Sequence, residues 1–217
     1  MRIARDGWVL VAGPLAAGAA CGLIGYREGW LAPAAWCAGL GAVGSLFMAY
    51  FFRDPERTPP ADPGLLVAGA DGLVRAVEDI REEKYLKADC VRISIFLSPF
   101  DVHVNRSPLS GVVRDLAYTP GRHLLTLRNA ASEFNEHSSI LIEGDRTRCL
   151  VRQIVGPVVR RVVYWLRLEQ RIGRAERIGM MKFGSRLDMY VPRADVRVLV
   201  KKGDRVYAGV TPVAAVV

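Results

Sequence analysis

The dipeptide Gly184-Ser185 joins two apolar runs near the end of a chain of 217 residues. A serine hydroxyl can act as a nucleophile when a base lies beside it. Read alone, however, a Gly-Ser pair between apolar strands indicates a tight turn, because glycine accepts any backbone conformation and serine can cap a turn. The pair needs a wider sequence context before it predicts chemistry.

Arginine dominates the basic residues, and its distribution along the chain is uneven. Lysine and arginine total 30 against 22 acidic residues, for a net charge of +8, and 25 of the 30 are arginine. The stretch 146–177 holds nine arginines but only Glu169 and Glu176, a local excess of +7. The planar guanidinium suits phosphate and carboxylate groups. An anionic membrane surface is the partner we expect, while a solvated surface stays open.

Several other classes of site find no support in the sequence. Cys21, Cys37, Cys90 and Cys149 form no CxxC pair and no Cys/His cluster, so we expect no metal. The sequence has no Gly-rich phosphate loop and no dinucleotide fingerprint. It also lacks an RNA-binding aromatic signature or a recognition-helix pattern, so we expect no nucleic-acid partner. Unpaired cysteines fit a reducing, cytoplasmic compartment.

Four blocks of sequence resemble the phosphatidylserine decarboxylase family, in its short bacterial and archaeal form. They keep the family's order and spacing from Phe51 to the end of the chain, and the last two are specific. The blocks are Phe51-Phe52-Arg53-Asp54-Pro55-Glu56-Arg57, Ala70-Asp71-Gly72, Phe96-Leu97-Ser98-Pro99-Phe100-Asp101-Val102-His103-Val104-Asn105-Arg106-Ser107-Pro108 and Gly179-Met180-Met181-Lys182-Phe183-Gly184-Ser185-Arg186-Leu187-Asp188-Met189-Tyr190-Val191-Pro192.

The resemblance implies that the chain is a proenzyme that cuts itself. The Ser185 hydroxyl would attack the Gly184 carbonyl, and elimination of the resulting ester would leave a pyruvoyl group on residue 185. The products would be a β chain, 1–184, and an α chain, 185–217. A decarboxylase of α-amino acids needs an electron sink. The pyruvoyl ketone would serve, through a Schiff base with the substrate amine, without pyridoxal phosphate.

The resemblance also implies a protease-like set of residues for the cleavage. Asp71 matches the family's aspartate, and His103 matches the first histidine of its Asp-x-His block. Longer members carry a second histidine three residues further on, where this chain has Arg106. We therefore expect His103 to be the base; a turn aspartate and an ordinary strand-end histidine are the plainer interpretations.

Four arginines are expected to bind the substrate's phosphate or carboxylate: Arg75, Arg106, Arg160 and Arg161. Binding of the carboxylate must stay weak, because only interactions that strengthen in the transition state speed its loss as CO₂. We therefore assign an arginine to the phosphate first.

Two long apolar runs precede these blocks. Residues 7–26 and 29–52 contain no charged side chain and are separated by Arg27 and Glu28. Each is long enough to cross a hydrocarbon core of roughly 30 Å as a helix. Arginines flank the pair on its outer sides, which places both ends, and the rest of the chain, in the cytoplasm. A signal peptide fits poorly because a second apolar run follows at once; a buried helical pair in a soluble core stays open.

The remainder reads as short strands, so we expect a mainly β fold. The predicted domains are a membrane anchor at 1–53, a Pro-rich linker at 54–64 and a catalytic domain at 65–217. Strand–turn–strand units such as 198–206 resemble those of lipoyl-type domains and indicate a compact β-sandwich. The predicted strands are 65–77, 91–97, 111–118, 123–127, 138–143, 149–155 and 158–168, with a short helix between about residue 77 and 88.

These patterns together predict a lyase at the inner cell membrane that converts phosphatidylserine to phosphatidylethanolamine and CO₂. A decarboxylase of another serine-headed lipid, such as archaetidylserine, is a close alternative. A non-enzymatic membrane adaptor built on a lipoyl-like sandwich would explain the anchor and the basic residues, but not the Gly184-Ser185 block. The sequence leaves a homo-oligomer open.

Overall fold

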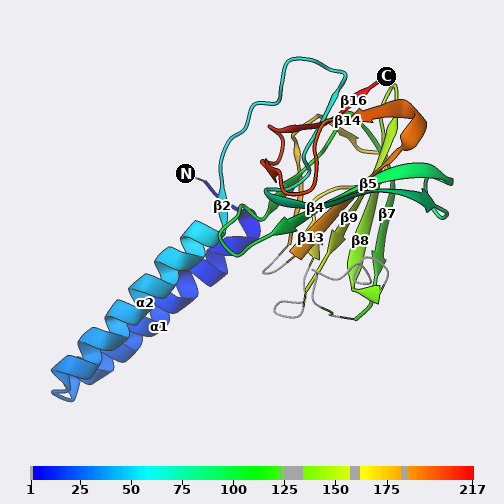
Figure 1. Ribbon diagram of the computed structural model, residues 1–217. Helices are drawn as coiled ribbons and strands as arrows, with labels where there is room; N and C mark the ends of the chain where they lie inside the picture. Colours follow the sequence, from blue (N-terminus) through cyan, green and yellow to red (C-terminus); the bar gives the residue numbers. More distant parts are fainter. Residues whose placement is uncertain (1, 123, 125–133, 157–161, 182–184) are drawn as a thin grey trace. The chain divides into compact units, whose positions relative to one another are not determined.

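The computed structural model describes the chain except residues 1, 123, 125–133, 157–161 and 182–184. The chain divides into two compact units, Met1–Pro55 and Glu56–Val217. The first unit is helical and the second is built from strands (Figure 1). A mainly β chain that begins with two apolar helices was the predicted fold class, and it is confirmed.

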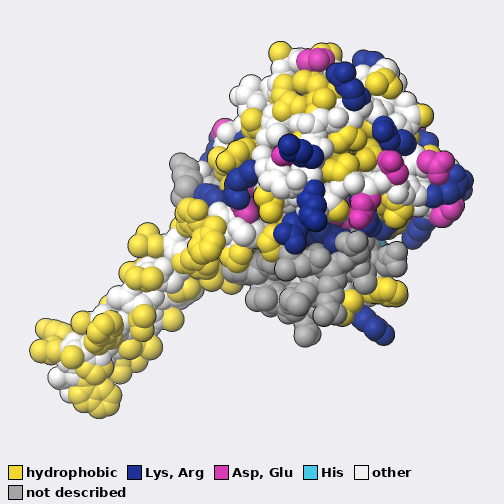
Figure 2. Space-filling view, in the orientation of Figure 1, with side chains coloured by type: hydrophobic (Ala, Val, Ile, Leu, Met, Phe, Trp, Pro, Cys, Tyr) yellow, Lys and Arg dark blue, Asp and Glu magenta, His cyan; other side chains and the backbone are white. Residues whose placement is uncertain are grey.

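Helices α1 (Trp8–Arg27) and α2 (Leu31–Phe51) make up most of the first unit. In each, only 11% of the most apolar window is buried, and hydrophobic side chains cover the pair (Figure 2). Each helix is long enough and apolar enough to cross a bilayer. Apolar surface on this scale is unfavourable in water, so the helices are compatible with membrane association.

Small residues let the two helices approach closely. A Cβ atom on Gly18 would lie 2.7 Å from both the Cys37 carbonyl oxygen and the Gly41 Cα. Further along, the Ser45 hydroxyl donates to the Val11 carbonyl oxygen at 2.7 Å. Close backbone packing and interhelical hydrogen bonds are the forces that hold helices together in lipid. At the open end, η1 (Arg5–Gly7) and the pairing of β1 (Arg2–Ile3) with β2 (Arg53–Asp54) join the two ends of the unit.

Replacing Gly18 with leucine should therefore separate the helices. Overpacking of a tight contact costs about 1–3 kcal/mol, so the detergent-solubilised Gly18→Leu protein should show a lower melting temperature for its helical signal. Gly39→Leu is the matched control, because a Cβ there meets nothing within 4 Å. Equal melting temperatures for the two variants would contradict the close contact.

The second unit is made of short strands and one 3-10 turn. They are β3 (Leu65–Val67), β4 (Gly72–Glu82), β5 (Ala88–Leu97), β6 (Val104–Arg106), β7 (Gly111–Thr119), β8 (His137–Glu143), β9 (Arg148–Ile154), β10 (Val162–Tyr164), β11 (Arg171–Ile172), β12 (Arg177–Met181), β13 (Ser185–Pro192), η2 (Arg193–Asp195), β14 (Val196–Val198), β15 (Arg205–Val206) and β16 (Pro212–Val216).

An eight-stranded sheet forms the centre of this unit, in the order β11-β7-β8-β9-β13-β5-β4-β15. The neighbours β4, β5, β13, β9, β8 and β7 run side by side through it (Figure 1). Two three-stranded sheets accompany it, in the orders β10-β12-β6 and β14-β16-β3. Strand β13 lies in the middle of the large sheet and pairs with β5 on one side and β9 on the other.

One face of the large sheet carries the hydrophobic core. Along β13, Leu187, Met189 and Val191 belong to the core cluster, together with Ile93 and Ile95 of β5. Side chains alternate between the two faces of a strand, so Ser185 at the start of β13 lies on the core face. Arg186 and Asp188 lie on the opposite face, yet both are buried. The second face is therefore covered as well, and it combines these charged residues with a smaller hydrophobic cluster that includes Cys90, Leu150 and Tyr190.

The predicted strands at 111–118, 138–143 and 149–155 are confirmed as β7, β8 and β9, and 91–97 lies within β5. The predicted strand 65–77 is two strands, β3 and β4, because the turn at 68–71 separates them. Of the predicted strand 158–168, residues 162–168 are described, and within them the strand is β10. Most of the predicted strand 123–127 lies outside the described residues.

The short helix predicted between about residue 77 and 88 is wrong. Strand β4 continues to Glu82 and pairs with β5, with Glu82 opposite Ala88. The Glu82 carboxylate accepts the backbone N–H groups of Tyr85 and Leu86 at 2.7 and 2.8 Å, which closes the turn. Of the charged residues that favoured a helix, Glu83, Lys84 and Lys87 are exposed at the end of the hairpin, whereas Glu82 is buried.

The predicted strand–turn–strand unit at 198–206 is present, but its strands belong to different sheets. β14 pairs with β16, whereas β15 pairs with β4. The turn between them has Gly203 at φ +98°, a conformation that favours glycine. Asp204 accepts the backbone N–H of Lys201 at 2.9 Å and holds the turn.

Candidate active site

A tight turn after β5 brings His103 into position. The Ser98 backbone N–H and hydroxyl both donate to Asp101 Oδ2, at 2.8 and 2.7 Å. Arg205 donates to the other oxygen of the same carboxylate. Asp101 is thereby fixed with 3% exposure, and the chain turns directly into His103 and β6.

His103 is fully buried, and its surroundings define its tautomer. Nδ1 lies 2.9 Å from the Asp101 backbone oxygen. A carbonyl oxygen can only accept, so Nδ1 carries the proton and Nε2 carries the lone pair. The His103 carbonyl in turn accepts the Met181 N–H at 3.3 Å. In its neutral form the imidazole would thus present Nε2 as a proton acceptor, beside the end of β12.

Ser185 begins the central strand β13 and is fully buried. Its partner across the ladder is Leu97, the last residue of β5. Among the described residues, its hydroxyl has no hydrogen-bond partner. Buried polar atoms almost always have one, and an exception calls for an explanation such as a catalytic role. Gly184, the other residue of the predicted scissile pair, lies outside the described residues.

The structure brings His103 and Ser185 to the same corner of the core by two independent routes. Ser185 pairs with Leu97, six residues before His103 along the chain. Met181, four residues before Ser185, donates to the His103 carbonyl. His103 therefore contacts the last described residue before the predicted cleavage point, and Ser185 is the first described residue after it.

Asp71 is held by a different set of partners from those expected. Its carboxylate receives two hydrogen bonds from Arg57, each of 2.8 Å, and one from the Ala208 backbone N–H, also 2.8 Å. The ion pair is nearly buried, with side-chain exposures of 10% and 6%. Two of the sequence blocks, the one ending in Arg57 and the one containing Asp71, thus meet in a bidentate pair. Among the described residues, no hydrogen bond joins Asp71 to His103.

The four predicted substrate arginines are placed differently from one another. Arg106 is buried and donates to the Ala175 carbonyl oxygen at 2.8 Å. Its Cδ packs against Gly209, where a Cβ would lie 2.9 Å away. Arg75 is exposed on β4. Arg160 and Arg161 lie outside the described residues.

The Arg-rich stretch does not form one free basic face. Arg152 is partly buried and lies 3.7 Å from Glu82, and Arg177 pairs with Glu56 at 3.0 Å. Arg174 donates to the Leu65 carbonyl oxygen at 2.7 Å and also to the carbonyl oxygens of Pro60 and Asp62, so it holds the segment that leads into β3. Several of the nine arginines are therefore structural.

A chain of buried amides and a hydroxyl lies on the core face and was not predicted. The Ser138 hydroxyl donates to Gln153 Oε1 at 2.7 Å, and Gln153 Nε2 donates to Asn105 Oδ1 at 2.7 Å. All three residues are fully buried. Asn105 belongs to the same sequence block as His103, but no role was assigned to it. The sequence held one signal for this group: side chains alternate along β8 and β9, and the alternation puts Ser138 and Gln153 on the face that otherwise carries core residues.

The second face of the large sheet holds three ion pairs, of which one is buried on both sides and two are partly buried. Arg186 and Asp188 of β13 pair at 3.0 Å with side-chain exposures of 4% and 0%. Arg92 of β5 pairs with Glu78, and Arg152 of β9 with Glu82. Buried charges persist in proteins only when they are paired, because desolvation is costly. Sequence reasoning missed this layer, although Arg186 directly follows Ser185.

The described residues hold no group of three potential metal ligands. Cys90 and Cys149 are buried, and burial raises the pKa of the Cys90 thiol to about 11. A thiol with so high a pKa is protonated at neutral pH and is a poor nucleophile.

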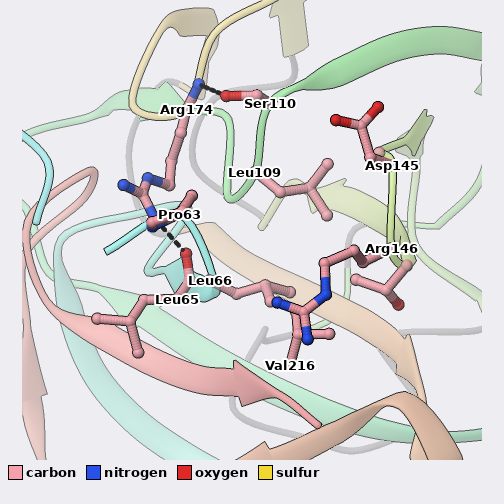
Figure 3. A pocket seen from close by; sticks show the side chains of 11 residues that line it. Pro63, Leu65, Leu66, Leu109, Ser110, Asp145, Arg146, Arg174 and Val216 are labelled. Carbon is pink, nitrogen blue, oxygen red and sulfur yellow. Dashed lines mark hydrogen bonds between the residues drawn. The ribbon is translucent and has the colours of Figure 1, made fainter. Parts of the chain in front are cut away.

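A pocket of about 200 Å³ lies away from these residues. Its wall combines the side chains of Leu109, Val216 and Arg146 with Arg174, whose backbone N–H donates to the Ser110 hydroxyl at 2.9 Å (Figure 3). None of the described site residues lines it. The pocket is lined by Pro63 and by residues 144–147, and its lining includes neither Ser185 nor His103.

Comparison with known proteins identifies the relatives of this chain. A family model described as phosphatidylserine decarboxylase matches residues 45–214. A phosphatidylserine decarboxylase proenzyme of Symbiobacterium thermophilum is 42% identical over 96% of this chain and 93% of its own length. Those of Carboxydothermus hydrogenoformans and Salinibacter ruber are 44% and 47% identical, over 76% and 78% of this chain and 78% and 76% of their own lengths. The chain therefore belongs to the phosphatidylserine decarboxylase family.

Proposed function

We propose that this decarboxylase converts phosphatidylserine to phosphatidylethanolamine and CO₂ with a pyruvoyl group that it makes from its own Ser185. The observation that carries the proposal is the Ser185 hydroxyl, fully buried at the start of β13 and without a partner among the described residues. A structural serine in a core is normally hydrogen-bonded. A serine whose hydroxyl must be free to attack a carbonyl group does not need such a hydrogen bond.

Cleavage would begin when His103 Nε2 takes the Ser185 hydroxyl proton. The oxygen attacks the carbonyl carbon of residue 184, and collapse of the tetrahedral intermediate breaks the peptide C–N bond, leaving an ester and an amine. Loss of the Ser185 Cα proton then expels the ester oxygen as the carboxylate of the β chain. Hydrolysis of the remaining dehydroalanine releases ammonia and leaves the ketone.

The residues around position 185 fit a pyruvoyl group. Conversion of Ser185 removes the one buried hydroxyl that lacks a partner on this strand, so no hydrogen bond among the described residues is lost. The pyruvoyl carbonyl would take up the electrons left when CO₂ departs. His103, held in one tautomer by Asp101, would return a proton to the product at the same corner.

The position of β13 explains how the two chains would stay together. Residues 185–192 pair with β5 on one side and β9 on the other. The strands β14 and β16 of the α chain also pair with each other, and β16 pairs with β3 of the β chain. These ladders and the core residues of β13 hold the α chain without the 184–185 bond, so the two should separate only on denaturation.

The membrane would deliver the lipid substrate. We infer that the two apolar helices anchor the protein with its catalytic unit on the cytoplasmic side, because Arg2, Arg5 and Arg53 flank the pair. Arg75, exposed on β4, is the described arginine best suited to meet a lipid phosphate. Arg106, buried against Ala175, is more suited to hold the loop beside β6.

The composition of the purified protein tests the proposal. We expect two chains on denaturing electrophoresis, with an α chain that begins at residue 185 and whose mass shows a terminal ketone in place of the serine. Reduction with borohydride in the presence of phosphatidylserine should add the mass of the lipid amine to that chain. A single active chain of 23.9 kDa would overturn the pyruvoyl mechanism, and a single inactive one would favour an adaptor.

A further inference from the structure

Asn105 presents a buried amide group that the mechanism above does not use. Its side chain is fully buried, and its Nδ2 has no hydrogen-bond partner among the described residues. Its Oδ1 is occupied by Gln153 Nε2 at 2.7 Å. The amide is therefore fixed at its oxygen, while its two N–H donors point into the core without an acceptor.

The amide is oriented from behind by a second and a third polar group. Gln153 Oε1 accepts from the Ser138 hydroxyl at 2.7 Å, which directs the Gln153 N–H groups toward Asn105. Gly179 of β12, opposite Asn105 in the ladder, leaves room for the Gln153 side chain, since a Cβ there would lie 3.2 Å from Nε2. These two hydrogen bonds thus fix which end of the Asn105 amide is the accepting oxygen and which is the donating nitrogen.

The ladders place the residues of this chain close to Ser185 and His103. Gln153 lies opposite Leu187 in the ladder, two residues from Ser185 on the same face of β13, which is a distance of about 7 Å along a strand. The pairing of β6 with β12 continues to His103, whose carbonyl accepts from Met181. Residues 103 and 105 therefore project from the same side of an extended chain.

We propose that Asn105 is the hydrogen-bond donor that stabilises the oxyanion formed when Ser185 attacks, with Gln153 and Ser138 as its positioning residues. The attack places a negative charge on the carbonyl oxygen of residue 184, which is bonded to the fully buried Ser185. A preorganised donor is most effective there, because no solvent competes and no reorganisation is needed. His103 takes the proton and Asn105 meets the charge. The role rests on the proposed self-cleavage.

The test follows the appearance of the α chain over time in freshly synthesised full-length protein. Loss of one oxyanion donor lowers rates by about 10²–10³, so Asn105→Ala should cleave at least about 10²-fold more slowly than wild type. Asn105→Asp should be no faster, because a carboxylate replaces the donor with an acceptor. Hydroxylamine, which cuts esters, should release no α chain from either variant, since both are blocked before the ester forms.

Neighbouring serines of β8 supply a matched pair for the positioning chain. Ser138→Ala should slow cleavage about tenfold with an unchanged melting temperature, because Gln153 loses the group that orients it. Ser139 is equally buried, but its hydroxyl, unlike that of Ser138, has no partner among the described residues, and alternation puts it on the opposite face. Ser139→Ala should therefore cleave at the wild-type rate.

Three outcomes would overturn the role of Asn105. They are cleavage of Asn105→Ala within about twofold of wild type, equal rates for Ser138→Ala and Ser139→Ala, or release of the α chain from Asn105→Ala by hydroxylamine, which would place its effect after the attack. If the wild-type chain cleaves, any of these removes the proposal for Asn105 alone. A wild-type chain that never cleaves removes the self-cleavage itself.

Discussion

Ser185→Ala is expected to remain a single chain of 23.9 kDa without decarboxylase activity. Alanine lacks the oxygen that attacks the neighbouring carbonyl, so neither the ester nor the ketone can form. The fold should survive, because the hydroxyl makes no hydrogen bond among the described residues and its removal leaves a methyl group on the core face. Denaturing electrophoresis and release of CO₂ from labelled phosphatidylserine measure the two effects.

Ser94→Ala is the control for this substitution. Ser94 is 2% exposed on β5, next to β13, and it lies opposite Asp188 rather than beside His103. It should yield two chains and an active enzyme. A Ser185→Ala protein that still appears as two chains would show that the peptide bond is broken elsewhere or by another protein.

The architecture could be predicted from the sequence because its signals are local. The two apolar helices follow from uncharged runs of helix length, and β7, β8 and β9 follow from alternating or apolar runs between turn residues. The short helix predicted at 77–88 was wrong because charged residues on the exposed face of the β4–β5 hairpin have the same composition as a polar helix. Which strands pair was also beyond local signals, as β14 and β15 show by joining different sheets.

The site was predictable only where a motif carried it. Ser185 and His103 were predicted from their blocks, and both are fully buried in the core. The bidentate pair of Arg57 and Asp71 was not foreseen, because a contact between a linker residue and a turn depends on how the strands between them fold. Asn105 and Gln153 were missed for the same reason: they come from different sheets and meet only across the core.

The buried ion pairs on the second face were the least predictable part. Arg92, Asp188 and Arg186 alternate with core residues along β5 and β13, a pattern that normally marks a solvated face. In this fold that face is buried too. Burial of a face depends on what packs over it, which the pattern within one strand does not report. Paired charges are what makes the burial tolerable.

Substitution of His103 is expected to have the second large effect. Removal of a general base lowers rates by about 10²–10⁴, so His103→Ala should show the α chain appearing that much more slowly. The fraction that matures should also turn over slowly, because the same imidazole would return the proton after CO₂ leaves. The rate of α-chain appearance and the turnover per ketone measure the two roles separately.

His137→Ala offers an unusually close control. His137 is also buried, and its Nδ1 also faces the backbone oxygen two residues earlier, that of Asn135, at 2.7 Å. Burial lowers the pKa of His137, which favours a neutral imidazole at neutral pH. It differs from His103 by lying on the opposite face of the large sheet from Ser185. If both variants lost cleavage to the same extent, the loss would come from removing a buried histidine from the fold and not from removing the base that acts on Ser185.

Asp71→Asn and Arg106→Ala complete the test of how His103 is supported. An aspartate that orients the imidazole of a hydrolase triad is worth about 10⁴ in rate, which is the loss expected if Asp71 acts on His103. Its carboxylate is instead occupied by Arg57 and Ala208, and the His103 tautomer is held by the Asp101 carbonyl.

We therefore expect Asp71→Asn to slow cleavage less than His103→Ala and to lower the melting temperature, because a nearly buried guanidinium loses its counter-ion. Arg106→Ala should leave the base intact, since an arginine stays protonated, and should act through the Ala175 loop. If Asp71→Asn instead abolishes cleavage at an unchanged melting temperature, the carboxylate must release Arg57 and turn to His103 before Ser185 reacts.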